Sequence, residues 1–496
     1  MGLAHTIWIS LLGAAWVALL GGRRPGAARA VALITSLAGL ISGLVGALGF
    51  GVGNELVTLW RVPWVPGLGI DFHLAADGVS VVMVLLTGIA AVAGVLFSWN
   101  IEHRSNEFFG LYLLLIAGVY GVFLSFDLFQ FFAFYELAIV PKYFLIAIWG
   151  STRREYGAMK LALYSFVGSA MVLVGVLAMV VVSGNGSFDM VKLASTPLPV
   201  GFQAWAFPLV FVGFAILAGL WPFHTWAPTG HVAAPTAASM LLAGVVMKLG
   251  AYGALRVAMM LMPLGAKQWG GVVAGLAVVG IVYAALVALV QTDFKFVIGY
   301  SSVSHMGFVL LGLAAANPRG VAGAVLQMFS HGVIAGLLFG VVGRMVYERT
   351  HTRELSLLEG LRLARLLPFA GVIFVLASVA SMGLPGFSGF VAELQVLMGA
   401  WQAFPAAALA AGVGVVLSVA FTLRVVQRAF LPDDTVPVTE PEHRLAPITV
   451  PEKLGALLLL GVSLWVGIAP RGLMEWIDAG LASPGFATLR STMGWP

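Results

Sequence analysis

The chain has 496 residues, of which 60% are hydrophobic and 9% charged, whereas an ordinary soluble protein carries about 25% charged residues. This composition excludes a water-soluble globular protein. The chain has no cysteine, which excludes a disulfide, a cysteine-ligated iron–sulfur cluster and a thioether-bound haem on it. Any redox cofactor must therefore lie on a partner. The net charge of +5 comes without a basic, aromatic-interleaved run, so we expect it to report membrane topology rather than nucleic-acid binding.

Apolar windows along the chain predict an all-α polytopic membrane protein with about 14 transmembrane helices. Each window is long enough, because about 20 apolar residues cross roughly 30 Å of hydrocarbon. In the outer loop 51–78, alternating residues predict a small β-hairpin. The predicted spans are 3–22, 30–50, 79–98, 107–125, 127–149, 158–183, 206–226, 236–262, 270–291, 296–315, 320–346, 366–400, 405–428 and 454–470.

The distribution of basic residues gives an orientation. Loops that follow odd-numbered spans hold 17 Lys and Arg, and the loops on the other side hold 7. Because cytoplasmic loops carry the excess of positive charge, both termini are expected on the non-cytoplasmic side. Two further lysines, Lys142 and Lys248, fall inside spans.

Four charged residues stand out within predicted spans: Glu136, Lys142, Lys248 and Glu393. Each costs at least about 2.5–3.5 kcal/mol at bilayer depth, so each predicts a functional site. The alternative for each is a buried ion pair or a side chain that reaches the interface, which is more plausible for Lys142 and Glu393 because they lie nearer the span ends. We interpret the four as groups that exchange protons, since a change in their separation alters which of them holds a proton.

Two histidines extend this series. His305 and His331 lie in spans ten and eleven and titrate near neutral pH, so they could relay protons, although a lone intramembrane histidine is as often a packing residue. A metal site is the competing chemistry. It would rely on His224 and His231, which are seven residues apart on proline-interrupted backbone, and no metal ligand set is predicted.

Spans seven and twelve are interrupted by proline and glycine, at 221–228 and 383–389. Proline removes an amide donor and clashes one turn back, and broken membrane helices are tolerated where they line a polar cavity. If spans four to eight and nine to thirteen are two five-helix units, each break falls in the fourth helix, as in inverted repeats of transporters. The predicted organisation is N-terminal helices 1–106, repeats 107–262 and 270–430, and a cytoplasmic loop, last helix and short tail 431–496.

Several motifs together resemble the antiporter-like membrane subunits of respiratory complex I (NADH–quinone oxidoreductase), and among them the subunit M (chain 4) group. The short tail, which has no room for the long lateral helix of the chain-5 group, agrees with this. The resemblance runs from the outer loop to span thirteen. The motifs are 69–78, Tyr135-Glu136 with Val140-Pro141, 143–150, 234–237, 241–244 with Lys248, 300–308 and 347–353.

The resemblance implies proton-transfer roles for Glu136, Lys248, His305, His331 and Glu393, and a charged entry to span ten at Asp293 and Lys295. It implies an enzyme subunit without a redox centre of its own, with FMN, iron–sulfur clusters and quinone on partner subunits. The implied partners are the other membrane-arm subunits and the phospholipids of a bacterial plasma (inner) membrane.

One position departs from the family pattern. The family has a lysine in span seven, seven residues before the histidine of its Pro-x-His-x-Trp motif, and this chain has Leu217 there. The usual acidic residue after Trp-x-Pro is likewise replaced by Thr229. We hypothesise that Lys142 supplies the missing charge for Glu136. Six residues along a helix correspond to a rise of about 9 Å and a rotation of about 240°, so the two would meet by bending of the lysine or through water.

Two other readings stay open. The chain could belong to a multisubunit cation/proton antiporter or a membrane-bound hydrogenase built from the same module, and small membrane partners without flavin subunits would mark the antiporter. It could also be a structural spacer whose altered span seven no longer conducts protons. Na⁺ is an alternative transported ion, since carboxylates serve both.

Overall fold

The computed structural model describes residues 2–20, 25–53, 56–433, 435–439, 441 and 443–495. Within these residues, thirteen helices are long and apolar enough to cross a membrane. The broken pair α18 and α19, of 14 and 16 residues, has together the length of one more span. The prediction of an all-α polytopic membrane protein with about fourteen spans is therefore confirmed.

The helices of these spans follow one another along the chain. Their bounds are α1 (Gly2–Leu19), α2 (Pro25–Phe50), α3 (Gly78–Phe97), α4 (Ser105–Leu124), α5 (Leu128–Trp149), α6 (Arg154–Ser183), α8 (Val200–Ala218), α9 (Trp226–Ala233), α10 (Thr236–Leu241), α11 (Met247–Gly253), α12 (Pro263–Val290), α13 (Phe294–Ala315), α14 (Pro318–Gly340), α18 (Pro368–Ser381), α19 (Ser388–Ala403), α20 (Pro405–Phe430) and α21 (Val450–Ile468).

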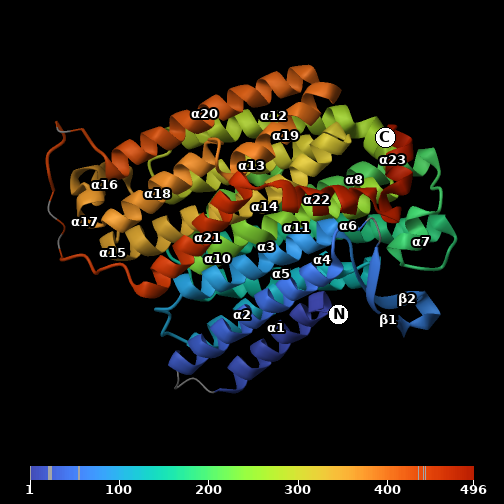
Figure 1. Cartoon of the computed structure of the whole chain (residues 1–496), viewed down its shortest axis with the longest axis horizontal. Coiled ribbons are helices and arrows are strands. Elements are labelled where there is room, and N and C mark those ends of the chain that lie inside the picture. Colours follow the sequence, from blue (N-terminus) through green and yellow to red (C-terminus); the bar gives the residue numbers. More distant parts are fainter. Residues whose placement is uncertain are drawn as a thin grey trace.

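The bundle has two distinct ends (Figure 1). Both termini lie at one end with the β-hairpin, α7 (Met190–Ala194) and α23 (Ala487–Met493), and we call this the terminal end. The opposite loop end carries the short helices α15 (Glu348–Thr350), α16 (Leu355–Leu361) and α17 (Leu363–Leu366). Arg23 and Arg24, two of the cations counted in the orientation prediction, lie outside the described residues.

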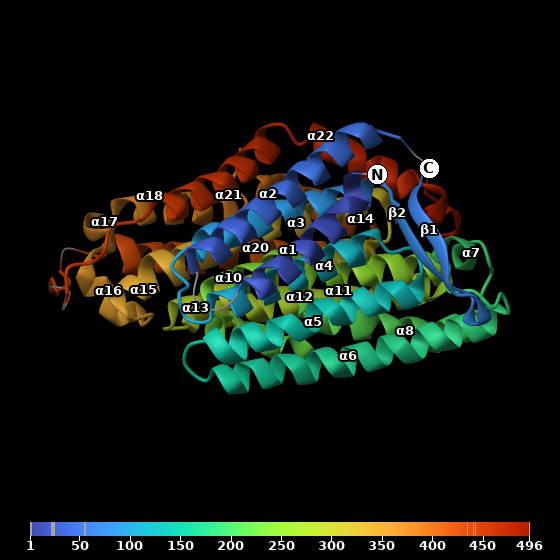
Figure 2. The ribbon, with the colours of Figure 1, turned by 90° about the horizontal axis from the view of Figure 1, so that it is seen from below.

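The centre of the bundle consists of α3, α10, α11, α13 and α14. In the spans of α10–α11 and α14 all of the most apolar window is buried, whereas in α2 and α20 only 33% is. Figure 2 shows α5, α6 and α8 along one edge of the molecule and α18, α21 and α22 toward the opposite edge. The ionisable residues on the central helices are therefore shielded from lipid by the surrounding helices.

Both predicted helix breaks are present. Span seven stops at Ala218, passes through a left-handed Gly219 and resumes as α9, and the Trp226 indole N–H donates to the Ile216 carbonyl at 2.8 Å across the break. Span twelve stops at Ser381 and resumes at Ser388. Gly383 and Gly386 adopt positive φ angles of 72° and 99°, which a side chain would strain. Each break leaves backbone groups of the two helix ends outside the regular helical hydrogen-bond ladder.

Span eight has an irregularity that its sequence did not predict. α10 and α11 are joined by a π-helical turn, Leu242–Val246, and a second π-helical segment, Ala254–Met259, follows α11. Each π turn inserts a residue into the helix and rotates the side chains that follow, and such turns occur frequently at functional sites. Lys248 lies in the seven-residue α-helical piece between the two.

The terminal end is closed by the hairpin and the tail. Strands β1 (Val57–Val65) and β2 (Ile70–Ala76) pair antiparallel, which confirms the predicted hairpin. The tail, for which no element was predicted, forms the amphipathic helix α22 (Arg471–Ala482), whose apolar side packs on α3. A fully buried ion pair between Arg256 and Asp77 lies beneath it, with the guanidinium 5.0 Å from the ring of Phe486. This pair fixes span eight to the start of α3.

Candidate functional site

Lys248 has its ammonium group buried at the centre of the bundle. The side chain is fully shielded from solvent, and its Nζ lies 2.7 Å from Nδ1 of His331 on α14. It also donates to the carbonyl of Ala243 in the π turn one helical turn earlier. The π turn therefore orients the Lys248 side chain and supplies one of its hydrogen-bond acceptors, since carbonyl groups in a π turn do not all accept the usual helical hydrogen bond.

A close approach of two helix backbones sets this distance. A Cβ added to Gly332, next to His331, would lie 2.5 Å from the carbonyl oxygen of Gly244, and one added to Gly244 would lie 3.4 Å from the Gly332 carbonyl. Small residues at such seams let membrane helices pack backbone to backbone. The contact brings Lys248 and His331 within hydrogen-bonding range.

His331 contacts the next residue of the series, His305 of α13. The two imidazole rings are stacked, with centroids 5.5 Å apart and planes 14° from parallel. The His305 ring is oriented by the Ser301 carbonyl, 2.8 Å from Nδ1, and by the Ser381 carbonyl at the break of span twelve, 3.0 Å from Nε2. Stacked rings do not hydrogen-bond each other directly. Proton transfer between them needs a water molecule or a ring rotation.

Glu393 is the last member of this series. Its Oε1 lies 3.4 Å from His305 Nε2 and accepts from the Gln327 side-chain amide at 3.4 Å. A Cβ on Gly383 would come within 2.8 Å of Glu393 Oε2, so the glycine makes room for the carboxylate at the helix break. Four of the six predicted residues, Lys248, His331, His305 and Glu393, thus form one continuous series across four helices.

The other two predicted residues, Glu136 and Lys142, lie apart from this series on α5. Lys142 is fully buried, and its Nζ has no hydrogen-bond partner within the described part of the chain. Glu136 is half-buried, and among the same residues it forms no direct ion pair with Lys142. Buried polar atoms without protein partners are normally satisfied by water, so this segment of α5 is a place where hydration is expected.

Leu217 stands at the position where the family pattern has the span-seven lysine. It is 1% exposed and lies on α8 against α11, where a Cβ on Gly250 would be 3.1 Å from the Leu217 carbonyl carbon. One turn earlier on α8, the Phe214 ring contacts the ring of Tyr135, the neighbour of Glu136, at 5.6 Å. The position therefore lies between α5 and the span of Lys248, and here it carries no charge.

The sequence-based site missed His231. This residue of α9 is fully buried, stacks on Phe339 at 4.6 Å, and neither ring nitrogen has a hydrogen-bond partner among the described residues. Besides its burial, the charged groups that influence it are Lys248 and Lys295. Its place directly after the break of span seven is the sequence signal for it, although the residues there suggest only a metal ligand.

Lys295 is a buried cation near the loop end. Its buried Nζ donates to the Ala234 carbonyl at 3.2 Å and lies 5.7 Å from the centre of the Tyr347 ring. It also lines a cavity of about 200 Å³ that includes Tyr347 and Glu348. Lys295 thus places a buried cation at the inner side of a polar opening at the loop end.

A second group of charges lies at the terminal end, outside the membrane spans. Asp189 accepts from His73 Nδ1 at 3.0 Å and pairs with Arg61 at 2.9 Å. Burial alone would raise the pKa of Asp189, but the His73 hydrogen bond, the backbone N–H of Lys192 and the charge of Arg61 together hold it below its ordinary value. This carboxylate stays ionised at neutral pH.

Asp127 behaves in the opposite way. It caps α5 by accepting from the backbone N–H groups of Phe129 and Gln130 at 2.9 and 3.1 Å, and it accepts from the Asp71 N–H at 3.1 Å. Burial nevertheless raises the pKa of Asp127 from 3.8 to about 6, with the Asp189 charge adding to the shift. The folded chain therefore binds this proton more tightly than the unfolded chain does.

The stability contributed by protonated Asp127 is full below about pH 4 and is lost as the pH rises through 6. An asparagine side chain at this position would stay neutral at every pH. Relative to the wild type, Asp127→Asn is thus expected to gain melting temperature between pH 5 and pH 7, by about 1–3 °C, in thermal unfolding of the purified complex. Asp433→Asn, in an exposed loop, is the control, and parallel pH profiles of wild type and Asp127→Asn would contradict the prediction.

Comparison with known proteins identifies the family to which this architecture belongs. The sequence profile of the NADH:quinone oxidoreductase/Mrp antiporter transmembrane family matches residues 125–419, which include both broken spans and all of the predicted site residues. The chain belongs to this family. Within it, the chain is 38% identical over 428 residues to the NADH-quinone oxidoreductase subunit M of Rhodobacter capsulatus, covering 84% of this chain and 82% of that one.

Other members give the same picture. The Escherichia coli (strain K12) NADH-quinone oxidoreductase subunit M is 36% identical over 425 residues, which cover 84% and 82% of the two chains. A chain of respiratory complex I from Thermus thermophilus superposes with a TM-score of 0.87 at 29% identity, covering 99% of this chain and all of that one. A chain of the Mrp complex from Dietzia sp. DQ12-45-1b has a TM-score of 0.85 at 21% identity, with 99% of this chain and 98% of that one covered, and shares the fold.

Proposed function

We propose that this chain is a proton-translocating membrane subunit of an NADH–quinone oxidoreductase, coupled to quinone reduction elsewhere in the complex. The observation that carries the proposal is the series Lys248, His331, His305 and Glu393, which links α11, α14, α13 and α19 through contacts of 2.7 to 5.5 Å. Ionisable groups are costly at this depth, and a row of neighbours whose protonation states depend on one another can move a proton. The names of the relatives, NADH-quinone oxidoreductase subunit M, support the same assignment.

Each residue of the series has a distinct role in this proposal. Lys248 donates a proton to Nδ1 of His331, and the neutral imidazole is the acceptor that the 2.7 Å contact requires. The proton passes between the stacked rings through water or ring rotation, and His305 then delivers it from Nε2 to the Glu393 carboxylate. Lys248 then regains a proton from the loop end by way of Lys295 and His231.

Glu136 and Lys142 on α5 provide the charges that control this series. Glu136 and Lys142 are six residues apart on one helix, and the family's span-seven lysine is replaced by the buried Leu217. We therefore assign Lys142 the role of that lysine. Its buried ammonium is fully desolvated, so a change in its hydration or in its distance from Glu136 changes the charge felt by neighbouring helices.

The orientation follows from the basic residues. Apart from Arg23 and Arg24, which lie outside the described residues, the Lys and Arg of the more basic side belong to the loop end and the 7 of the other side to the terminal end. We therefore place the loop end in the cytoplasm of a bacterium and both termini outside. We assign 107–262 and 270–430 as inverted repeats, because the breaks after α8 and α18 occupy the fourth helix of each unit. FMN, iron–sulfur clusters and quinone belong to partner subunits.

Purification of the intact assembly through a tag on this chain tests the function. We expect subunits with flavin and iron–sulfur absorbance to copurify, and proteoliposomes of the assembly to translocate protons when NADH and a quinone are added. Proton translocation should persist in sodium-free buffer, which separates H⁺ from Na⁺ as the transported ion. Copurification of small membrane subunits alone, with Na⁺/H⁺ exchange and no NADH oxidation, would instead identify a cation/proton antiporter.

A further inference from the structure

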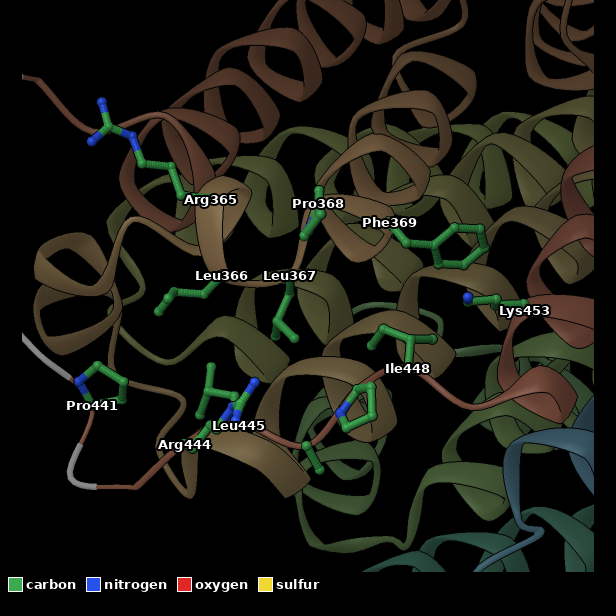
Figure 3. A pocket seen from close by; sticks show the side chains of 12 residues that line it. Arg365, Leu366, Leu367, Pro368, Phe369, Pro441, Arg444, Leu445, Ile448 and Lys453 are labelled. Carbon is green, nitrogen blue, oxygen red and sulfur yellow. The ribbon is translucent and has the colours of Figure 1, made fainter.

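A large hollow lies at the loop end, away from the proton-transfer series. It has a volume of about 790 Å³ and opens between the first residues of α18, the first residues of α21 and the segment that precedes α21 (Figure 3). Figure 3 shows Lys453 at one end, Arg365 with Arg444 at the other, and Leu367 and Ile448 between them. We call it the loop-end hollow.

The charged side chains that line the loop-end hollow are all positive. Arg365, Arg444 and Lys453 form no ion pair within the described residues, and no acidic side chain lines the hollow there. Glu452, next to Lys453, is buried and already pairs with two arginines outside the hollow, at 2.6 and 2.8 Å, so it does not neutralise the site. Glu440 and Glu442 of the preceding segment lie outside the described residues.

The N-terminus of α18 adds to this potential, whereas that of α21 is occupied by a capping box of Thr449 and Glu452. α18 begins at Pro368 and α21 at Val450, and residues at both starts line the hollow. The N-terminus of α18 has no side-chain cap, so its first backbone N–H groups remain available to an anion. Helix N-termini carry partial positive charge and favour phosphate, which reinforces the cationic side chains.

The rest of the site is apolar and continues into the membrane-facing surface. Leu367 and Phe369 form its apolar lining, and Lys453 lies 5.7 Å from the centre of the Phe369 ring. Farther along α18 and α21, large apolar side chains are exposed, with Val372 at 60%, Leu454 at 54% and Leu457 at 52%. A ligand that is anionic at one end and hydrocarbon at the other would match both parts.

We propose that the loop-end hollow binds an anionic phospholipid, with Arg444 and Lys453 attracting its headgroup from opposite ends of the hollow and the acyl chains along α18 and α21. Arg365, whose guanidinium points outward in Figure 3, attracts the headgroup from the rim. Basic pockets at the cytoplasmic ends of membrane helices bind acidic headgroups in this way. An acidic protein segment would satisfy the cations but would leave the exposed apolar strip below them uncovered.

The intact complex, delipidated in detergent and titrated with phosphatidylglycerol or phosphatidylcholine, tests this by native mass spectrometry. We expect Arg444→Gln/Lys453→Gln to weaken retention of one phosphatidylglycerol per complex by about 30-fold, roughly fivefold for each cation, with phosphatidylcholine unaffected. Lys192→Gln/Lys267→Gln is the matched control. It removes two exposed cations at the terminal end that form no ion pair among the described residues, and it should retain the lipid.

Arg444→Lys/Lys453→Arg keeps both charges and should also retain the lipid, which separates binding from a folding defect. Millimolar inorganic phosphate should not displace the lipid, because phosphate lacks the acyl chains. Equal retention in wild type and Arg444→Gln/Lys453→Gln would overturn the proposal. Equal loss in both Gln pairs would also overturn it, as would displacement by phosphate or cross-linking of a neighbouring subunit's acidic segment into the hollow.

Discussion

Lys248→Met is expected to lower proton translocation coupled to NADH oxidation by on the order of 100-fold, the scale of losing a positioned proton donor. Methionine has nearly the length of lysine and no branch, so it fills the same space without the ammonium. His331 would then lose the partner 2.7 Å from its Nδ1, and the series would be cut at its first contact. The measurement is the initial rate of acidification in proteoliposomes of the purified complex.

The control for this variant is Lys267→Met, which removes an exposed lysine at the start of α12 and should leave the rate unchanged. Subunit composition, determined alongside, separates lost transfer from lost assembly. An assembled Lys248→Met complex that translocates protons at the wild-type ratio of protons to electrons would contradict the assignment. That result would favour the reading of this chain as a structural spacer.

The second large effect is expected at Lys142. Lys142→Met should lower coupled proton translocation by about tenfold or more, because Glu136 then has no cation on α5 and Leu217 supplies none from α8. The structure also provides a rescue. Leu217 lies one helical turn after Phe214, whose ring contacts Tyr135 beside Glu136. A lysine at position 217 would therefore start from a part of α8 that lies close to α5. Lys142→Met combined with Leu217→Lys is therefore expected to regain most of the lost rate.

The neutral substitution Leu217→Met in the Lys142→Met background is the matched control and should restore nothing. Restoration by both Leu217→Lys and Leu217→Met would show that packing, not charge, had been repaired. Full translocation by Lys142→Met alone would show that this chain works without a cation near Glu136. Each readout is the acidification rate at equal amounts of assembled complex.

The spans, both breaks and the hairpin were predictable from the sequence, because each depends on local properties. About twenty apolar residues must cross the bilayer, and the Pro and Gly residues at 221–228 and 383–389 interrupt a helix wherever the rest of the chain lies. Lys248 and Glu393 could be singled out as candidate site residues for a similar reason, since a charge at bilayer depth is costly wherever it lies along the chain.

The contacts between these residues were not predictable in the same way. That His331 approaches Lys248 while Glu136 and Lys142 remain apart from them depends on how α14 packs on α10 and α11. The π-helical turn Leu242–Val246 is likewise a product of packing, because the sequence there is an ordinary apolar run. His231 was overlooked since its importance comes from Lys248 and Lys295, which only the fold brings near it.

The seam between Gly244 and Gly332 has a consequence for how motion can reach the proton-transfer series. With backbone touching backbone, neither helix can rotate or slide toward the other, so any signal arriving from a distant reaction must be transmitted by swinging side chains and rearranging solvent. The scaffold acts as a rigid frame around a few movable parts. Even one methyl group at residue 332 would wedge that frame apart and lengthen the gap that the proton has to jump.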